Sequence, residues 1–362
     1  MALELIEDNG FNSTLATVLT GGWNAWLAKG YPTASGETLD EGTAQETAGP
    51  EFDVVQAAAL GYLTSSPQWN TTAADLYLLL NDGDPDNDPV IVSVRAAADY
   101  AKGHIPGAIN IPLADLAKPE NLAKLPTDRK IVVYCYTGHT GSQATAILNV
   151  LGYDASNLKF GMASWIMDTE VAPGRYIEAS DCMDYRVETT ANVPARTYAL
   201  PTIENSTSNN IADILRAAAN AYLTSGPQWN MTASSLYLLL NDGDPDNDPV
   251  IISVRAAADY VRGHVPGAIN IQLADLARPE SLAMLPLDRQ IVVYCYTGHT
   301  GSQATAILNL LGYDATNLKF GMTSWTLDTD VAPGRYNEAT DCKDYPFETG
   351  VPETDTGEDD CG

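Results

Sequence analysis

Short apolar runs alternate with amphipathic stretches along most of the chain. Two runs, 90–94 and 131–135, have the length and composition of strands that are buried on both faces, as in a parallel sheet. The stretches 72–81, 96–103 and 112–125 have helical spacing of apolar residues, and so does the stretch after the second run. Strands that alternate with helices predict an α/β fold, with ligands bound where the carboxyl ends of strands meet the amino ends of helices.

The same pattern occurs twice. Residues 62–185 match residues 222–345 at a constant offset, with roughly four positions in five identical. A repeat this long, with strands and helices of its own, predicts two tandem globular domains. The expected division is a first domain at 53–188, a second domain at 211–348, linkers at 34–52 and 189–210, and an acidic tail at 349–362.

Residues 1–33 resemble part of a third copy. The segment 18–26 is similar to 158–165, so the region corresponds to the last strand and helix of a repeat. An isolated half-domain cannot bury its own apolar face. We therefore expect it to dock on a neighbour, which allows self-association through this fragment.

Charge and composition exclude two classes of protein. The 362 residues include 47 Asp and Glu against 19 Lys and Arg, a formal net charge of −28. Such a chain would repel phosphates, which excludes nucleic acid as a partner. The apolar runs are far too short to span a bilayer. No secretion signal opens the sequence, so the compartment is unknown, although the acidic composition favours the periplasm or cell surface over the cytoplasm. Five cysteines are too few for a disulfide scaffold.

The most informative segment follows the second apolar run. The cysteine ends a buried strand, and the next helix is expected some six residues later, so backbone N–H groups and the helix dipole favour a thiolate there. Glycines let the loop curl, and its hydroxyls add donors. The alternative is an inert buried cysteine. The loop residues are Cys135, Tyr136, Thr137, Gly138, His139, Thr140, Gly141 and Ser142, repeated as Cys295, Tyr296, Thr297, Gly298, His299, Thr300, Gly301 and Ser302.

Each repeat resembles a rhodanese, or sulfurtransferase, domain along nearly its whole length. The resemblance rests on several motifs in the same order, found in both repeats. In the first repeat these are Val94-Arg95, the turn Gly103-His104-Ile105-Pro106-Gly107-Ala108-Ile109-Asn110, the cysteine loop and Leu158-Lys159-Phe160-Gly161-Met162. The second repeat has Arg255, the turn beginning Gly263-His264, the Cys295 loop and Gly321-Met322.

The resemblance implies two parallel five-stranded sheets, each flanked by helices on both faces. It also implies that Cys135 and Cys295 accept sulfane sulfur as a persulfide and pass it on, with Arg95 and Arg255 in supporting positions and no cofactor required. The donor would be thiosulfate, polysulfide or a persulfide, and the acceptor a thiol or a cyanide-like nucleophile. The competing hypothesis is a non-enzymatic sulfur-binding or structural scaffold.

Two departures from the family pattern affect the choice of donor. Members that use thiosulfate often carry Arg or Lys in the loop, whereas His139 and His299 are the candidate cations here. Ser93 and Ser253 stand where the family has Asp. These changes favour persulfide chemistry over thiosulfate as donor. We expect His139 either to act on the thiolate or substrate or to face solvent, and His104 to be structural.

The remaining candidate features are an acidic turn and three further cysteines. The turn could bind Ca²⁺ or could be a simple exposed turn, and its spacing excludes an EF-hand because Asn87 and Ser93 occupy positions 6 and 12. The candidate calcium ligands are Asp82, Asp84, Asp86 and Asp88, with Asp242, Asp244, Asp246 and Asp248 in the second repeat. Cys182, Cys342 and Cys361 could resolve a persulfide, pair or simply pack.

Overall fold

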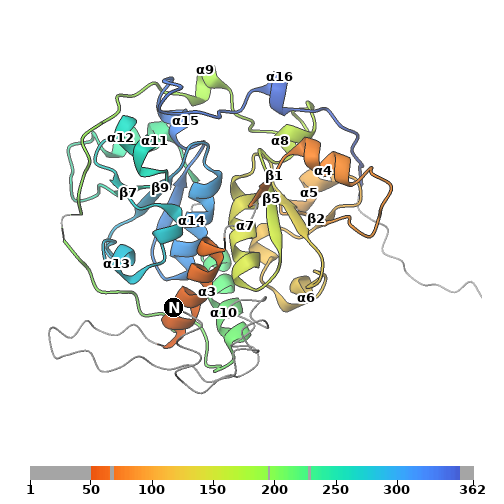
Figure 1. Cartoon of the computed structure of the whole chain (residues 1–362), viewed down its shortest axis with the longest axis horizontal. Coiled ribbons are helices and arrows are strands. Elements are labelled where there is room, and N and C mark those ends of the chain that lie inside the picture. Colours follow the sequence, from red (N-terminus) through yellow and green to blue (C-terminus); the bar gives the residue numbers. More distant parts are fainter. Residues whose placement is uncertain (1–49, 66–68, 195, 227–229, 351–362) are drawn as a thin grey trace, which may run out of the picture.

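The computed structural model describes residues 50–65, 69–194, 196–226 and 230–350. These residues form two α/β domains that lie side by side and share one topology (Figure 1). The partial third copy predicted at 1–33 lies outside the described residues. Among the helices of the described residues, none has the length and apolarity needed to cross a membrane.

Each domain contains one parallel five-stranded sheet, as predicted. The strand order is β1-β5-β4-β2-β3 in the first domain and β6-β10-β9-β7-β8 in the second. The central strands are almost wholly buried, which explains their unbroken apolar composition. The strands are β1 (Asn70–Thr71), β2 (Val90–Ser93), β3 (Ile109–Asn110), β4 (Ile131–Tyr134), β5 (Ala155–Leu158), β6 (Asn230–Met231), β7 (Val250–Ser253), β8 (Ile269–Asn270), β9 (Ile291–Tyr294) and β10 (Ala315–Leu318).

The helices flank the sheets at the predicted places, with two differences. The stretch 112–125 divides into a short 3-10 helix and a separate helical turn, because Pro119 starts a new helix. The helices of the first domain are α3 (Pro50–Thr64), α4 (Ala73–Leu79), α5 (Ala97–Lys102), η2 (Leu113–Asp115), α6 (Pro119–Leu122), α7 (His139–Val150), α8 (Met162–Trp165) and α9 (Glu178–Asp181). Those of the second are α10 (Ile211–Thr224), α11 (Ala233–Leu239), α12 (Ala257–Arg262), η3 (Leu273–Asp275), α13 (Pro279–Leu282), α14 (His299–Leu310), α15 (Met322–Trp325) and α16 (Glu338–Asp341).

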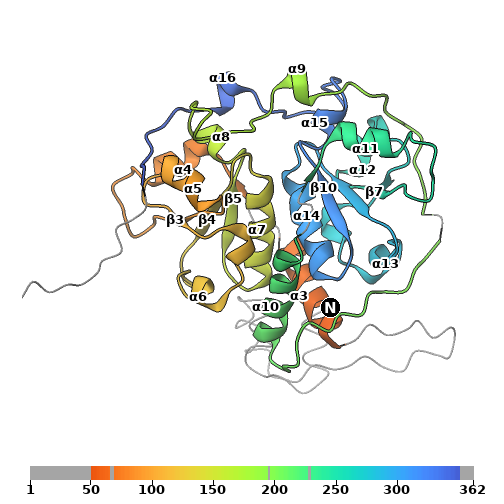
Figure 2. The same ribbon diagram turned by 180° about the vertical axis from the view of Figure 1, so that it is seen from behind.

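The second difference concerns α7 and α14, which begin at His139 and His299, four residues after each cysteine rather than six. These two helices pack against each other at the centre of the molecule, as seen from the front and from behind (Figures 1 and 2). Helices α3 and α10 lie below them, and one continuous apolar core runs through all four. Burial of a shared core is expected to make the two domains one cooperative unit.

The two repeats exchange their C-terminal segments. Residues 183–188 pack on the second domain, where the Tyr185 N–H donates to the Trp325 carbonyl at 2.7 Å. Residues 343–348 pack on the first domain, where the Tyr345 N–H donates to the Trp165 carbonyl at 2.8 Å. Short antiparallel bridges join Glu188 with His264 and Glu348 with His104. Each C-terminal segment therefore packs on the domain formed by the other repeat.

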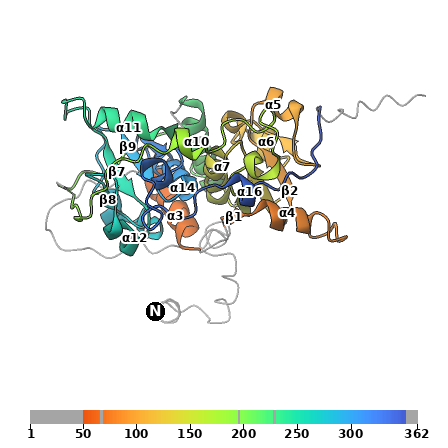
Figure 3. The ribbon, with the colours of Figure 1, turned by 90° about the horizontal axis from the view of Figure 1, so that it is seen from above.

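The crossing is visible in the figures. In Figure 1 the chain leaves α8, passes α9 and descends along the second domain, while the chain after α15 passes α16 and descends along the first. Seen from above, α7 and α14 lie between the two sheets (Figure 3). Two ion pairs join the crossing segments near their starts: Arg175 with Glu338, and Arg335 with Glu178.

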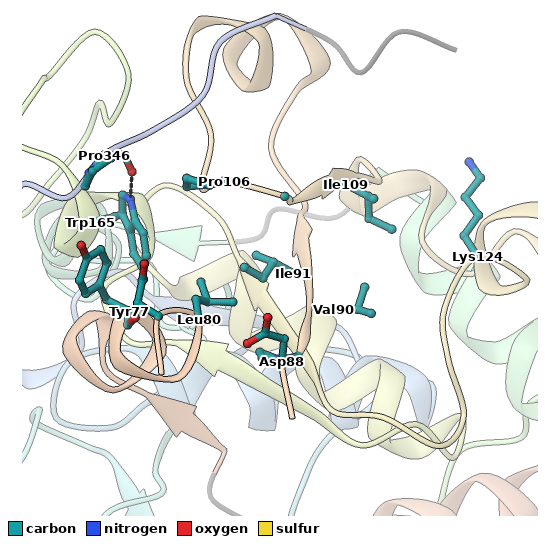
Figure 4. Close-up of a pocket in the computed structure, with 13 residues that line it drawn as sticks. Tyr77, Leu80, Asp88, Val90, Ile91, Pro106, Ile109, Lys124, Trp165 and Pro346 are labelled. Carbon is teal, nitrogen blue, oxygen red and sulfur yellow. Dashed lines mark hydrogen bonds between the residues drawn. The ribbon is translucent and has the colours of Figure 1, made fainter. Parts of the chain in front are cut away.

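The exchanged segment closes one side of a cavity of about 640 Å³ in the first domain (Figure 4). The Trp165 indole donates to the Pro346 carbonyl at 2.8 Å, and the Tyr345 ring stacks on Tyr77 with centroids 3.9 Å apart. Val90, the first residue of β2, lines this cavity, so the cavity lies at the amino ends of the strands. The cysteine loop follows β4 and lies at the opposite, carboxyl ends.

Candidate functional site

The cysteine of each loop lies directly after a buried strand. The Cys135 side chain is 2% exposed, and its Sγ accepts a hydrogen bond from the Gly138 N–H at 3.1 Å. Gly298 donates to the Cys295 sulfur at the same distance. Gly138 has a φ of +86°, a left-handed conformation that turns its N–H toward the sulfur and that glycine adopts at little cost. The loop therefore presents a backbone donor and the amino end of α7 to the sulfur.

A second segment supports the loop from behind. The Met162 N–H donates to the Cys135 carbonyl at 2.8 Å, and the Ala163 N–H donates to the Tyr136 carbonyl at 3.0 Å. Gly161 lies so close that a Cβ there would be 2.5 Å from the Cys135 carbonyl oxygen. This contact gives a physical role to the Gly161-Met162 motif, because only glycine permits the approach.

Arg95 supports the site without lining the cavity beside the cysteine. Its guanidinium is 1% exposed and donates to the Val171 carbonyl at 2.9 Å, to the Gly103 carbonyl and, through Nε, to the Ser93 hydroxyl at 3.3 Å. Ser93 thus provides an acceptor at the position where the family has Asp. The same bonds recur around Arg255. Each arginine therefore connects the glycine of its Gly-His turn to the segment that contains Val171 or Val331.

The histidine of the Gly-His turn has the structural role that the sequence predicts. His104 is buried and its Nδ1 lies 3.0 Å from the Tyr100 carbonyl, which fixes the Gly-His turn. His264 makes the same contact with Tyr260 at 2.8 Å. These two histidines are structural.

The loop histidines do not face solvent. His139 is 2% exposed; its Nε2 accepts a hydrogen bond from the Phe320 N–H of the second domain at 3.1 Å, and its Nδ1 lies 2.7 Å from the Thr137 hydroxyl. Because Nε2 accepts, the ring is neutral with its proton on Nδ1. Burial first, and then the electrostatic interaction with His299, which disfavours protonation, hold the pKa of His139 well below its usual value. His299 makes the reciprocal bond with the Phe160 N–H, also at 3.1 Å.

The other predicted loop residues have mixed roles. The Thr137 hydroxyl is paired with His139, and Gly141 packs so tightly that a Cβ would lie 2.5 Å from the Asn157 side chain. Ser142 is fully buried within α7, and its hydroxyl has no hydrogen-bond partner among the described residues. Tyr136 and Thr140 line the cavity beside the cysteine, as Thr137 does.

That cavity has a volume of about 330 Å³ and is formed by both domains. The first domain contributes the loop, Asp99 and the turn at Pro173, whereas the second contributes Asn230 and Lys319. Asp99 accepts hydrogen bonds from Lys102 and from the Tyr136 hydroxyl, which lower its pKa. Sequence reasoning missed Lys319 because nothing in a linear repeat shows which residues of one copy face the loop of the other.

The acidic turn satisfies its own backbone. Asp82 accepts from the Asp84 N–H at 2.8 Å and from the Asn87 amide at 3.0 Å, and these bonds lower the pKa of Asp82. In the part of the chain that the structure describes, no three His, Cys, Asp or Glu side chains are grouped so that they could hold a metal ion. The calcium site stays a prediction.

Cys182 and Cys342 are unpaired thiols within the crossing segments, at the carboxyl ends of α9 and α16. Both belong to an apolar cluster with Phe160, Tyr176 and their counterparts in the second repeat. Burial raises the pKa of the Cys182 thiol. Packing is therefore the role that the contacts support, and Cys361 lies outside the described residues.

A family model for the rhodanese-like domain matches residues 72–168 and 232–328. A sulfurtransferase of Allochromatium vinosum is 35% identical over 79 residues, covering 22% of this chain and 72% of the relative. A thiosulfate:glutathione sulfurtransferase of Saccharomyces cerevisiae is 27% identical, covering 23% of this chain and 68% of the relative. An HTH-type transcriptional regulator of Mycobacterium tuberculosis is 38% identical over 115 residues, which is 31% of this chain. The chain spans 47% of the length of that regulator.

Among solved structures, a thiosulfate sulfurtransferase from Pseudomonas aeruginosa aligns with 83% of this chain and 49% of its own, at 17% identity and a TM-score of 0.27. A rhodanese-like domain protein from Staphylococcus aureus aligns with 26% of this chain and 86% of its own, at 29% identity and a TM-score of 0.24. The two ranges of the family model together cover more than half of the sequence, and neither extends into residues 1–33. The chain therefore belongs to the rhodanese-like domain family, with two domains of that family in tandem.

Proposed function

We propose that the protein is a sulfurtransferase with two active cysteines, Cys135 and Cys295. The observation that carries the proposal is the position of each sulfur, which follows a buried parallel strand and accepts a backbone N–H from the loop. The Cys135 sulfur also adjoins a cavity. A backbone donor and a helix amino end favour the thiolate, which is the nucleophilic form of cysteine. The sulfurtransferase names of several relatives support the same chemistry.

The reaction divides into two displacements. The cysteine thiolate attacks the outer sulfur of the donor and forms a new S–S bond. The donor's own S–S bond breaks, and its electron pair leaves with the rest of the donor. When the donor is thiosulfate, this leaving group is sulfite. The resulting cysteine persulfide is then attacked at its terminal sulfur by a thiolate or by cyanide. That step restores the cysteine thiolate and releases a persulfide or thiocyanate.

The test is the intact mass of the protein after brief exposure to thiosulfate or polysulfide and then to cyanide. We expect a gain of about one sulfur atom per domain that cyanide removes, and the loss of one addition in each of the variants Cys135→Ser and Cys295→Ser. A matched control is Cys182→Ser, which should retain both additions. No cyanide-sensitive gain with either donor, in protein with titrated free thiols, would overturn the proposal and favour a non-enzymatic scaffold.

A further inference from the structure

The cavity beside Cys135 receives one of its walls from the second domain. We propose that Lys319 supplies the positive charge that the Cys135 loop lacks, and that Lys159 does so for Cys295, so that each site binds a small anionic sulfur donor with a cation from the opposite domain. The inference rests on the proposed function, whose donor class it specifies.

The loop itself offers no cation. No Lys or Arg occurs between residues 135 and 142, and His139 is neutral because its Nε2 accepts a hydrogen bond in a buried position. Arg95 is turned away into carbonyl acceptors. Among the described residues that line the cavity, Lys319 is the one that carries a positive charge.

One carboxylate lines the same cavity and opposes an anion. Asp99 is bonded to the Lys102 ammonium at 2.6 Å and to the Tyr136 hydroxyl at 2.6 Å. The neighbouring lysine offsets its charge, and Asp99 has no comparable contact with Lys319. The positive charge of Lys319 is therefore free to act on a bound anion.

The backbone around Lys319 is held by the domain interface. Its N–H donates to the Met231 carbonyl at 2.8 Å, and the next residue, Phe320, donates its N–H to His139 at 3.1 Å. Phe320 has a φ of +62°, a left-handed conformation that is costly for an aromatic residue and persists only where its surroundings determine it. The ammonium lies 4.8 Å from the Phe320 ring centroid. The contact that joins the domains therefore also places the lysine at the first site.

The second site repeats the arrangement with the roles exchanged. Phe160 has a φ of +63° and donates its N–H to His299 at 3.1 Å. The Lys159 ammonium lies 4.9 Å from the Phe160 ring centroid. Lys159 therefore directly precedes the residue that bonds to His299, as Lys319 directly precedes the residue that bonds to His139.

Alkylation of a single cysteine tests the proposal without sulfur transfer. Iodoacetate is anionic and iodoacetamide is neutral, and each reacts when the thiolate displaces iodide. The measurement uses Cys295→Ser protein and follows alkylation of the Cys135 peptide by mass spectrometry. The quantity is the rate with iodoacetate divided by the rate with iodoacetamide. Addition of Lys319→Gln should lower this ratio on the order of tenfold. Lys319→Arg should restore most of the ratio.

The repeat provides matched controls. In the same background, Lys159→Gln should leave the ratio at Cys135 unchanged, and in Cys135→Ser protein the two lysine variants should exchange their effects at Cys295. With thiosulfate as donor, Lys319→Gln should raise KM in the Cys295→Ser protein by a similar factor and change kcat little.

Two outcomes would overturn the inference: an unchanged ratio in Lys319→Gln, or a fall in Lys159→Gln at Cys135, which would place the cation in the same domain. A charge-dependent alkylation ratio without persulfide formation would support the anion site and contradict sulfur transfer. The two proposals therefore fail separately.

Discussion

His139 and His299 stack with parallel rings across the domain interface, with ring centroids 5.6 Å apart and ring planes 4° from parallel. Each ring accepts a backbone N–H from the other domain, so both are neutral. Burial lowers the pKa of His299 to about 3 and that of His139 well below its ordinary value. Protonation of either ring would break its interdomain bond and place a charge in the core.

The first prediction is a loss of stability in mild acid. Above the ordinary histidine pKa of about 6.5, folded and unfolded chains both hold neutral rings, and the pair contributes no pH dependence. As the pH falls below that value, the unfolded chain binds protons that the folded chain does not, so folding is penalised. We expect each ring to cost about 1.4 kcal/mol of unfolding free energy between pH 7.5 and 5.5, measured by urea denaturation.

A variant without titrating rings isolates this effect from that of the carboxylates. In His139→Gln/His299→Gln the amide oxygen can accept the Phe N–H, and neither side chain binds a proton in this range. The double variant should lose less stability than the native protein over the same pH interval. Equal losses in the two proteins would contradict the assignment.

Gly138 is expected to tolerate no side chain. It has a φ of +86°, and a Cβ would lie 2.4 Å from the His299 Nε2 atom. Gly138→Ala should therefore lower the unfolding free energy by more than the roughly 1 kcal/mol that a left-handed alanine costs, and slow sulfur transfer. Gly107→Ala is the matched control, because Gly107 has a φ of +73° and no neighbour within 4 Å of a Cβ. If both variants lose the same stability, the interface contact is unimportant.

Deletion of residues 343–350 should increase local unfolding of the first domain, although these residues follow the second repeat in the sequence. The deletion exposes Trp165 and removes the stacking partner of Tyr77. Hydrogen exchange should rise in peptides that contain β2 and α4 and change less in those that contain β7 and α11. The reverse pattern would show that each segment stabilises its own repeat.

Ser93→Ala should destabilise the protein by about 1–3 kcal/mol, because the Arg95 Nε loses its acceptor in a buried position. Ser93→Asp, which introduces the residue usual in the family, should restore or exceed the native stability by placing a carboxylate beside the guanidinium. Urea denaturation of both variants tests this. A lower stability of the Asp variant than of the Ala variant would contradict it.

Much of the fold could be predicted from the sequence because its signals are local. The apolar runs that became β2 and β4 need only the composition of a buried strand, and the Gly-rich loop after Cys135 needs only turn chemistry. The second copy then repeated each signal, which made the tandem arrangement evident.

The interface could not be predicted, because its contacts join residues about 140 to 180 positions apart. A lone histidine in a glycine loop gives no sign that it will accept a hydrogen bond from a phenylalanine N–H in the other repeat. The start of α7 at His139 was also missed, because a left-handed glycine ended the loop two residues earlier than its length suggested. Lys319 was missed for the same reason as the histidine contacts.

The exchange of segments 183–188 and 343–348 gives the molecule the contact pattern of an isologous dimer, although it is one polypeptide. A residue of one repeat meets its own counterpart across a pseudo-twofold axis, as the stacked imidazoles do. In a true homodimer every substitution at that axis would occur twice. Fusion of the two copies removes this constraint, so the sequence of one loop can change while the other loop stays the same.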